Sequence, residues 1–174
     1  LDRGIRLAHE YDVEAPLAQW KSARDEISTA INERGYDPGR GVFVRAFGSR
    51  DMDASLLLLP GMGFIEYDDP RMVRTVDAIR DELDVDGLVL RYRSEDGLHG
   101  DEGTFIACTF WLVECLARGG RKGEAQEVFD RASSTANDLG LFAEEYLTEA
   151  GEMAGNFPQG LTHLSHISAL VALS

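Results

Sequence analysis

The sequence predicts an all-α fold, and three of its features indicate this. Apolar residues recur at helical spacing along most of the chain, Pro and Gly residues separate these segments, and only one short segment alternates as a strand would. The length of 174 residues and the 44% hydrophobic content suffice for one domain with a buried core. Helix pairs that alternate with long loops are typical of an α/α toroid or a helical solenoid. No fixed-period repeat supports the solenoid.

The N-terminal third contains two predicted helices and two shorter segments. Residues 1–11 continue a helical pattern, and a second helix runs from a proline at its first turn to about residue 34. A turn over 35–39 leads into a short extended segment over 42–47. The apolar run 56–59 has no polar face, so we expect a buried helix there.

The remaining chain contains helices separated by two long loops. The expected helices span residues 70–83, 105–117 and 121–136, and a last one starts at Pro158. The loops span 84–102 and 137–157. Loops of this length without regular structure are typically functional or disordered, so we look for a site in them.

The charge of the chain argues against several function classes. A net charge of −14 repels phosphate backbones and anionic lipid, so we expect no nucleic-acid partner and no membrane. No apolar run is long enough to span a bilayer, and no signal-peptide pattern is visible. The two cysteines suggest a reducing compartment, and we expect a cytoplasmic protein. The acidity is compatible with a neutral substrate such as a sugar, but a solvated acidic surface accounts for most of it.

The two cysteines, Cys108 and Cys115, lie seven positions apart in a helical pattern. Two helical turns separate their backbones by roughly 10 Å, which is too far for a disulfide, so we expect buried free thiols. The sequence starts within a helical pattern and ends in an apolar run. We therefore expect a piece of a larger domain.

Three acidic residues in the long loops are candidates for chemistry. Glu144 and Glu145 are adjacent in a loop before a helix, where one carboxylate could act as a general base, although solvated carboxylates are the simpler interpretation. Glu102 lies at a predicted helix start, where an acid also complements the helix dipole. Because adjacent side chains diverge, we expect only one of Glu144 and Glu145 to enter a given pocket.

Other residues could bind a ligand. The Arg91-Tyr92 pair could contact a sugar, with the ring stacking and the guanidinium donating hydrogen bonds, or it could be surface charge. His163 and His166 share a helix face, but no third ligand has a metal-site spacing, so core or rim histidines are favoured and we expect no metal or cofactor. Trp111 is expected in the core.

Three segments carry a family resemblance: Met-Asp-Ala-Ser-Leu-Leu-Leu-Leu-Pro at 52–60, Glu-Gly-Thr-Phe to Cys-Thr-Phe-Trp-Leu-Val-Glu at 102–114, and Ala-Glu-Glu-Tyr through Gly-Asn-Phe-Pro-Gln-Gly to Thr-His at 143–163. In this order they resemble the C-terminal half of the catalytic domain of family 15 glycoside hydrolases, which includes bacterial glucoamylases and trehalase-like proteins. The resemblance covers essentially the whole chain, residues 1–174.

The resemblance implies part of an (α/α)6 toroid, the second half of a double ring of helices, with the active site at one end. It further implies hydrolysis of terminal α-linked glucose with inversion, which uses one acid and one base. Glu144 matches the general base. The positions that match substrate-binding residues of the family are Arg91, Tyr92, Glu102 and Glu145.

The family's general acid has no counterpart on this chain. It lies upstream of a helix similar to the first one here, and neither Glu10 nor Glu14 matches it. We therefore expect the chain to need a missing N-terminal half, or a self-associating partner, and to be inactive alone. The expected substrate is an α-linked glucose di- or oligosaccharide, with trehalose slightly favoured. The alternative function is a catalytically inactive, stand-alone helical binding or scaffold module.

Overall fold

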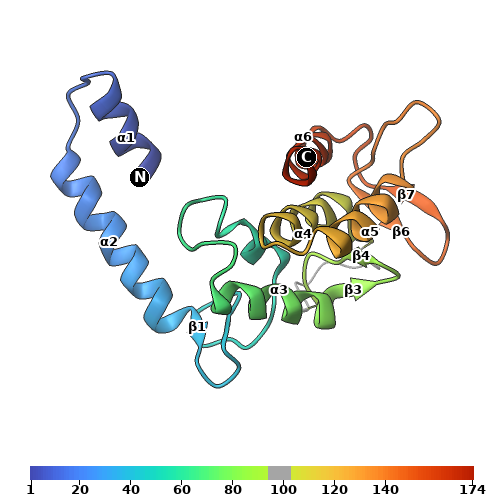
Figure 1. Ribbon diagram of the computed structural model, residues 1–174, viewed down its shortest axis with the longest axis horizontal. Helices are drawn as coiled ribbons and strands as arrows, with labels where there is room; N and C mark the ends of the chain where they lie inside the picture. Colours follow the sequence, from blue (N-terminus) through green and yellow to red (C-terminus); the bar gives the residue numbers. More distant parts are fainter. Residues whose placement is uncertain (94–102) are drawn as a thin grey trace.

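A computed structural model describes residues 1–93 and 103–174, and the fold is mainly helical (Figure 1). The prediction of a helical protein is confirmed, although three small antiparallel sheets accompany the helices in this described part of the chain. Glu102, which was predicted at a helix start, lies outside the described residues. None of the described helices is both long and apolar enough to cross a membrane.

The first two helices form a hairpin that projects from the rest of the molecule (Figure 1). Helix α1 (Asp2–Glu10) buries Ile5 and Ala8, whereas no residue of α2 (Leu17–Arg34) is buried within the described chain. A Cβ atom added at Gly4 would lie 3.3 Å from the ring of Trp20, so the two helices approach closely there. The predicted apolar face of α2 is therefore only partly covered.

The next segment leads from a strand pair to a short helix. Strand β1 (Tyr36–Asp37) pairs antiparallel with β2 (Val42–Phe43). Element η1 (Ala54–Leu58) is a 3-10 helix, not the buried α-helix predicted for the leucine run, and only its central Leu57 is fully buried among its leucines. A 3-10 turn fits here because Pro60 follows and cannot continue an α-helix.

Helix α3 (Pro70–Leu83) begins as the sequence predicts, with proline in its first turn and the side chain of Asp69 accepting a hydrogen bond from the N–H of Arg71. A hairpin of β3 (Asp84–Val85) and β4 (Leu88–Val89) follows directly, where a loop was expected. Its two turn residues, Asp86 and Gly87, both have positive φ, which is the conformation that an Asp-Gly hairpin turn requires.

The second predicted loop, 137–157, also contains a hairpin. Strand β6 (Glu145–Leu147) pairs with β5 (Thr104–Phe105) on one side and with β7 (Glu152–Ala154) on the other. Strands of two or three residues are too short to produce a recognisable alternation, so periodicity did not reveal them. The consequence for the site is that Glu145 belongs to a strand, with Glu144 directly before it.

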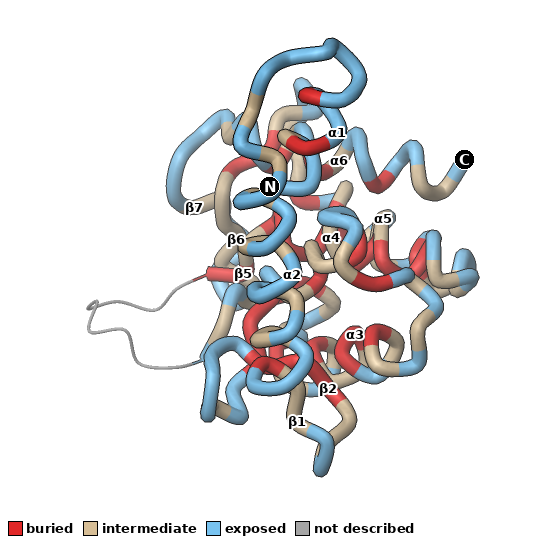
Figure 2. The backbone as a smooth tube through the Cα atoms, turned by 90° about the vertical axis from the view of Figure 1, so that its left-hand side faces the viewer, coloured by how far each residue is buried: buried red, intermediate tan, exposed pale blue. Residues whose placement is uncertain are grey.

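The C-terminal helices pack as a layer around α4. Helix α4 (Ile106–Arg118) contacts α5 (Lys122–Ser133) and α6 (Gly160–Leu173), and Figure 1 shows α6, seen nearly end-on, above the pair. One apolar core extends from this layer to α3 and to the β1–β2 and β3–β4 strand pairs. Figure 2 shows that α6 is largely exposed on its outer side. Its large apolar side chains lie there: Leu161, Leu164, Ile167, Leu170 and Val171.

Buried threonines on three helices bind the neighbouring extended segments. The hydroxyl of Thr75 on α3 accepts the N–H of Phe43 in β2 (3.0 Å), and that of Thr109 on α4 accepts the N–H of Val89 in β4 (2.9 Å). The hydroxyl of Thr162 on α6 donates to the carbonyl of Ala143 (3.1 Å). A buried strand edge needs such partners, and the last of these bonds fixes the chain next to Glu144.

Candidate active site

Glu144 is fixed through its backbone to two different elements. Its N–H donates to the carbonyl of Asn156 (2.9 Å), in the segment between β7 and α6. Its carbonyl accepts the N–H of Ile106 (3.1 Å), the first residue of α4. The side chain is held as well, because Oε2 accepts hydrogen bonds from Nδ2 (2.8 Å) and from the backbone N–H (3.1 Å) of Asn156. The carboxylate therefore has a defined orientation.

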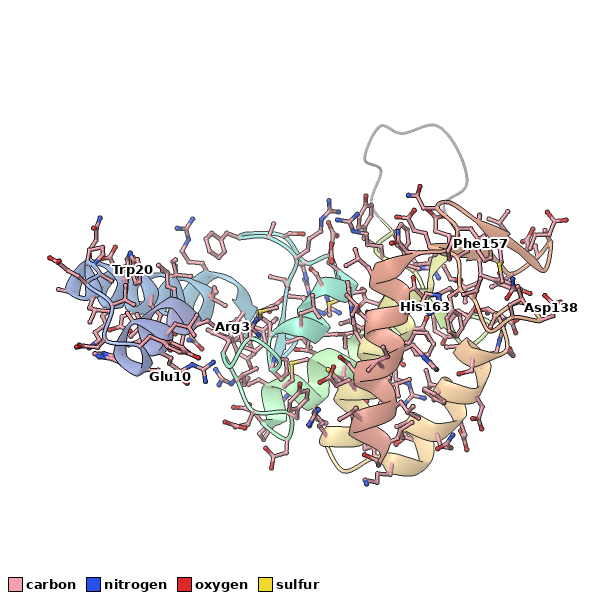
Figure 3. The ribbon with its side chains drawn as sticks, turned by 90° about the horizontal axis from the view of Figure 1, so that it is seen from above. Arg3, Glu10, Trp20, Asp138, Phe157 and His163 are labelled. Atoms are coloured by element: carbon pink, nitrogen blue, oxygen red, sulfur yellow. The ribbon has the colours of Figure 1, made fainter. Side chains whose placement is uncertain are left out.

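The residues before Glu144 are held by the start of α6. The N–H of Phe142 donates to Nε2 of His163 (3.2 Å), and the carbonyl of Phe142 accepts the N–H of Gln159 (2.9 Å). Figure 3 labels His163 on α6 and Phe157 in the segment that leads into this helix. The acidic pair is thus carried by a framework of α4 and α6 rather than by a loose loop.

The two histidines of α6 belong to an aromatic cluster. The ring of His166 stacks on Phe129 at 5.3 Å and lies 5.1 Å from Phe110, while His163 contacts Phe142 at 5.3 Å. Burial lowers the pKa of His166 below its ordinary value, and the neighbouring His163 lowers it further. The prediction of core or rim histidines agrees with this arrangement. Among the described residues, His, Cys, Asp and Glu side chains form no group of three that could hold a metal ion.

Glu144 lies on the wall of a cavity of about 260 Å³. The wall comes from five segments of the chain: the start of η1, the residues after the β3–β4 hairpin, the end of β5 with the first half of α4, the residue before β6, and the start of α6. Mixed apolar and polar walls of this kind are typical of small-ligand sites. The lining residues are Asp53, Ser55, Arg91, Phe105, Ala107, Cys108, Trp111, Glu144, Gln159, Leu161 and Thr162.

Arg91 and Glu144 are the predicted site residues that the structure brings together at this cavity. Glu145 is directed elsewhere, since its carboxylate accepts the N–H of Gly103 (2.9 Å) on the neighbouring strand edge. The divergence follows from the extended backbone, in which successive side chains point to opposite faces. Glu144 therefore lines the cavity and Glu145 does not.

Tyr92 also lies outside the lining of this cavity. Its ring is covered by two guanidinium groups, that of Arg45 at 4.6 Å and that of Arg91 at 5.4 Å from the ring centre. Cation–π contacts of this type fix both partners. The position of Tyr92 suits a residue that supports Arg91, while its predicted contact with substrate remains a prediction.

Asp53 and Trp111 are two of the cavity residues that were not identified as site residues from the sequence. Asp53, only 9% exposed, accepts the N–H of Ser55 (2.8 Å) as the cap of η1 and lies 4.0 Å from the guanidinium of Arg45. Trp111 was predicted in the core, and this was wrong in part: the residue is half-buried, lines the cavity, and donates its indole N–H to Ser165 (2.9 Å). An Asp before an apolar run is interpreted as a helix cap, so the place of Asp53 on the cavity wall could not be inferred from the sequence.

Both cysteines are free and buried, as predicted. Cys108 reaches the cavity wall, where burial and the charge of Asp53 raise its pKa to about 12, against a lowering by Arg91. Burial likewise raises the pKa of Cys115 to about 12. A thiol that is protonated at neutral pH is a poor nucleophile, so Cys108 contributes packing rather than covalent chemistry.

The acidic residues near the N-terminus are remote from this cavity. Glu10 is exposed at the end of α1, and Figure 3 shows it with Trp20 on the projecting hairpin, at the opposite end of the molecule from His163. Glu14 is exposed in the connection between α1 and α2. The described part of the cavity therefore offers two carboxylates, Glu144 and Asp53, with the cation of Arg91. Such a set can orient a water molecule and bind hydroxyl groups.

Comparison with known proteins finds relatives that are named trehalase. The trehalase of Mycobacterium tuberculosis (strain ATCC 25618 / H37Rv) is 48% identical over 174 residues, which cover 98% of this chain and 25% of that protein. The trehalase of Thermoplasma volcanium (strain ATCC 51530 / DSM 4299 / JCM 9571 / NBRC 15438 / GSS1) is 44% identical over 167 residues, covering 95% of this chain and 27% of that protein. The chain thus spans about a quarter of the length of these relatives.

The fold has solved counterparts. A structure described as a wild-type glycosidase superimposes with a TM-score of 0.78 at 24% sequence identity, over 92% of this chain and 46% of that chain. A variant glycosidase in complex with glucose gives the same TM-score at 23% identity. The model of the family described as Glycosyl hydrolases family 15 matches residues 1–171. The chain therefore belongs to glycosyl hydrolase family 15.

Proposed function

We propose that this chain supplies the general-base part of the active site of an inverting α-glucoside hydrolase, with Glu144 as the base. The observation that carries the proposal is the placement of Glu144: its carboxylate lies on the cavity wall and is held through one oxygen by Asn156. A general base must present a fixed acceptor to the water that it deprotonates. Family membership makes hydrolysis of a glycosidic bond the chemistry that fits this geometry.

In the proposed reaction, a water molecule donates a hydrogen bond to Glu144 and attacks the anomeric carbon of the terminal glucose. The carbon–oxygen bond to the leaving sugar breaks on the opposite face, and the water's proton passes to the Glu144 carboxylate. A second carboxyl group protonates the leaving oxygen. In inverting enzymes the two carboxyl groups lie roughly 6.5–9.5 Å apart, which leaves space for the water.

We propose α,α-trehalose as the substrate, with a terminal α-linked glucooligosaccharide as the second candidate. The relatives that share 48% and 44% of their aligned residues with this chain are both named trehalase, which favours the disaccharide. Arg91 is the best-placed described residue to donate hydrogen bonds to sugar hydroxyls, because it lines the same cavity as Glu144. The contacts predicted for Tyr92, Glu102 and Glu145 stay predictions.

We further propose that residues 1–174 form the C-terminal portion of an (α/α)6 toroid, and that an N-terminal half of the same domain supplies the acid. Two observations support this. The chain spans 46% of a solved glycosidase that it superimposes on. The outer face of α6 carries a row of exposed large apolar side chains that another layer of helices would cover. The acid is therefore expected outside this chain.

The test of the base is Glu144→Gln in the full-length hydrolase that contains this chain. The amide keeps the size of the side chain but does not accept a proton, so kcat on trehalose should fall at least ~100-fold. Glu152→Gln, at an exposed position on the same hairpin, is the matched control and should leave kcat within about twofold. Hydrolysis retained by Glu144→Gln at more than about a tenth of the parent rate would refute the assignment.

A second measurement tests the stereochemistry independently of any variant. Inversion at one half of α,α-trehalose releases one β-glucose from the attacked sugar and one α-glucose from the leaving sugar. Proton NMR during the first minutes, before the anomers interconvert, should therefore show both anomers in equal amounts. Retention would give α-glucose alone, and that result would contradict an inverting mechanism.

A further inference from the structure

Glu144 and Asn156 are joined by three hydrogen bonds. One links the N–H of Glu144 to the carbonyl of Asn156 (2.9 Å). The other two run from Asn156, through Nδ2 (2.8 Å) and the backbone N–H (3.1 Å), to the same carboxylate oxygen of Glu144, Oε2. An amide side chain and its own backbone thus converge on one acceptor.

This convergence makes the two carboxylate oxygens different. Oε2 has two donors, whereas Oε1 has no hydrogen-bond donor among the described residues. A base needs one oxygen available to water and a side chain that does not rotate away from it. The Asn156 bonds satisfy the second requirement and leave Oε1 for the first.

The backbone before Asn156 is shaped for this contact. Gly155 has φ of +71°, a conformation that L side chains rarely adopt, and a Cβ atom added there would lie 2.9 Å from Oε2 and 3.0 Å from Cβ of Glu144. Any larger residue would therefore push the carboxylate out of its place. The Gly155-Asn156 pair brings two donors to Glu144 at a distance that only glycine allows.

We propose that Asn156 is a positioning residue for the base: it holds Oε2 of Glu144 so that Oε1 is presented to the attacking water. The proposal rests on the proposed role of Glu144 and extends it. The competing interpretation is that Asn156 only fastens the connection between β7 and α6, in which case its loss would affect stability and not the reaction.

The test uses two variants in the full-length hydrolase. Asn156→Asp keeps the shape of the side chain but replaces the donor by a carboxylate beside Oε2. We expect the acidic limb of the kcat–pH profile to move to higher pH, because a neighbouring negative charge disfavours the ionised form of a carboxyl group. Asn156→Ala removes one donor, and kcat should fall about tenfold or more, as for loss of a hydrogen bond to a charged group, with KM within about threefold.

Asn137 provides the matched control. Its side chain fastens the other end of the 137–157 segment by accepting the N–H groups of Leu139 (3.0 Å) and Leu141 (2.9 Å), and it does not contact Glu144. Asn137→Ala should lower the Tm and leave kcat and its pH profile unchanged. A purely structural role for Asn156 would give the same pattern in Asn156→Ala, so kcat and the pH profile of that variant separate the two interpretations.

The outcomes are distinct. If Glu144→Gln is inactive and both Asn156 variants fold with the parent's kcat and pH profile, the positioning role is wrong while the base assignment stands. If Glu144→Gln remains active, the base assignment fails and the positioning role fails with it. Should Asn156→Asp not fold, Asn156→Ala carries the test, since it retains the backbone N–H bond to Glu144; normal turnover in this variant would overturn the proposal.

Discussion

Helices α4 and α6 pack against each other and are both rich in apolar residues, yet they bury opposite kinds of side chain. In α4 the large residues are inside, and Phe110, Leu112, Val113 and Leu116 are at most 1% exposed. In α6 the buried residues are the small or polar Thr162, Ser165 and Ala169. Small residues on the inner face of α6 allow it to approach α4 closely.

The large apolar residues of α6 lie on its outer face, away from α4. Leu161, Leu164, Ile167, Leu170 and Val171 are between 52% and 66% exposed and follow helical spacing along one side. A contiguous apolar face of this kind marks a surface that another element covers. The comparison therefore distinguishes a region whose packing is complete within the described residues from one that is completed, as proposed, by the other half of the domain.

The largest expected effect is in α4, whose packing is complete within the described residues. Leu116, 1% exposed in α4, belongs to the central core. Leu116→Ala should lower the free energy of unfolding by about 2–5 kcal/mol, because it removes buried methyl groups and leaves a cavity. Chemical denaturation of the full-length protein measures this loss. A change below about 1 kcal/mol would mean that α4 is not packed as described.

The second prediction tests the exposed apolar face of α6. If the proposed N-terminal half covers α6, Leu164→Ala in the full-length protein should cost about 2 kcal/mol or more, although Leu164 is 63% exposed here. Leu139, 75% exposed in a loop, provides the control, and Leu139→Ala should change stability by less than about 0.5 kcal/mol. Equal, negligible effects of the two substitutions would contradict the proposed cover on α6.

The same contrast shows how far the sequence predicts the fold. Helix α3 could be placed because Asp69 and Pro70 form a recognisable start. The β3–β4 hairpin was missed although Asp86-Gly87 is a known turn signal, since its strands are too short to show alternation. The burial of α6 could not be predicted, because its large apolar residues lie on the side that faces away from the core, where hydrophobic periodicity would place the buried face.

The site was predictable only in part, for a related reason. Family resemblance identified Glu144, and the adjacency of Glu145 indicated that only one carboxylate would enter a pocket. Asp53 and Asn156 come to Glu144 from positions 91 residues before it and 12 residues after it. Asp53 shares a cavity wall with Glu144, and Asn156 shares three hydrogen bonds with it. Contacts of this kind are set by tertiary packing, and no local pattern encodes them.

A third prediction concerns the polar link between the two helices. The indole N–H of Trp111 on α4 donates to Oγ of Ser165 on α6 (2.9 Å), and this hydroxyl donates in turn to the carbonyl of Leu161 (2.8 Å). Trp111→Phe removes the link and should cost about 1 kcal/mol of stability beyond the lost ring area. A double-mutant cycle with Ser165→Ala isolates the bond. Strictly additive effects would show that the bond does not contribute.

The smallest expected effect is a pH dependence on the inner side of α6. Burial among Phe110, Phe129 and Phe142, together with the neighbouring His163, lowers the pKa of His166 below its ordinary 6.5. The unfolded chain therefore binds the proton more readily than the folded one, so this contribution to stability is complete above about pH 6.5 and is lost as the pH falls below it.

His166→Phe keeps the aromatic packing without a titratable group. The free energy of unfolding should consequently fall less between pH 7 and pH 5 in this variant than in the parent. Equal pH slopes for the two proteins would mean that His166 is as well solvated in the folded chain as in the unfolded one, which would contradict its packing against Phe110 of α4 and Phe129 of α5.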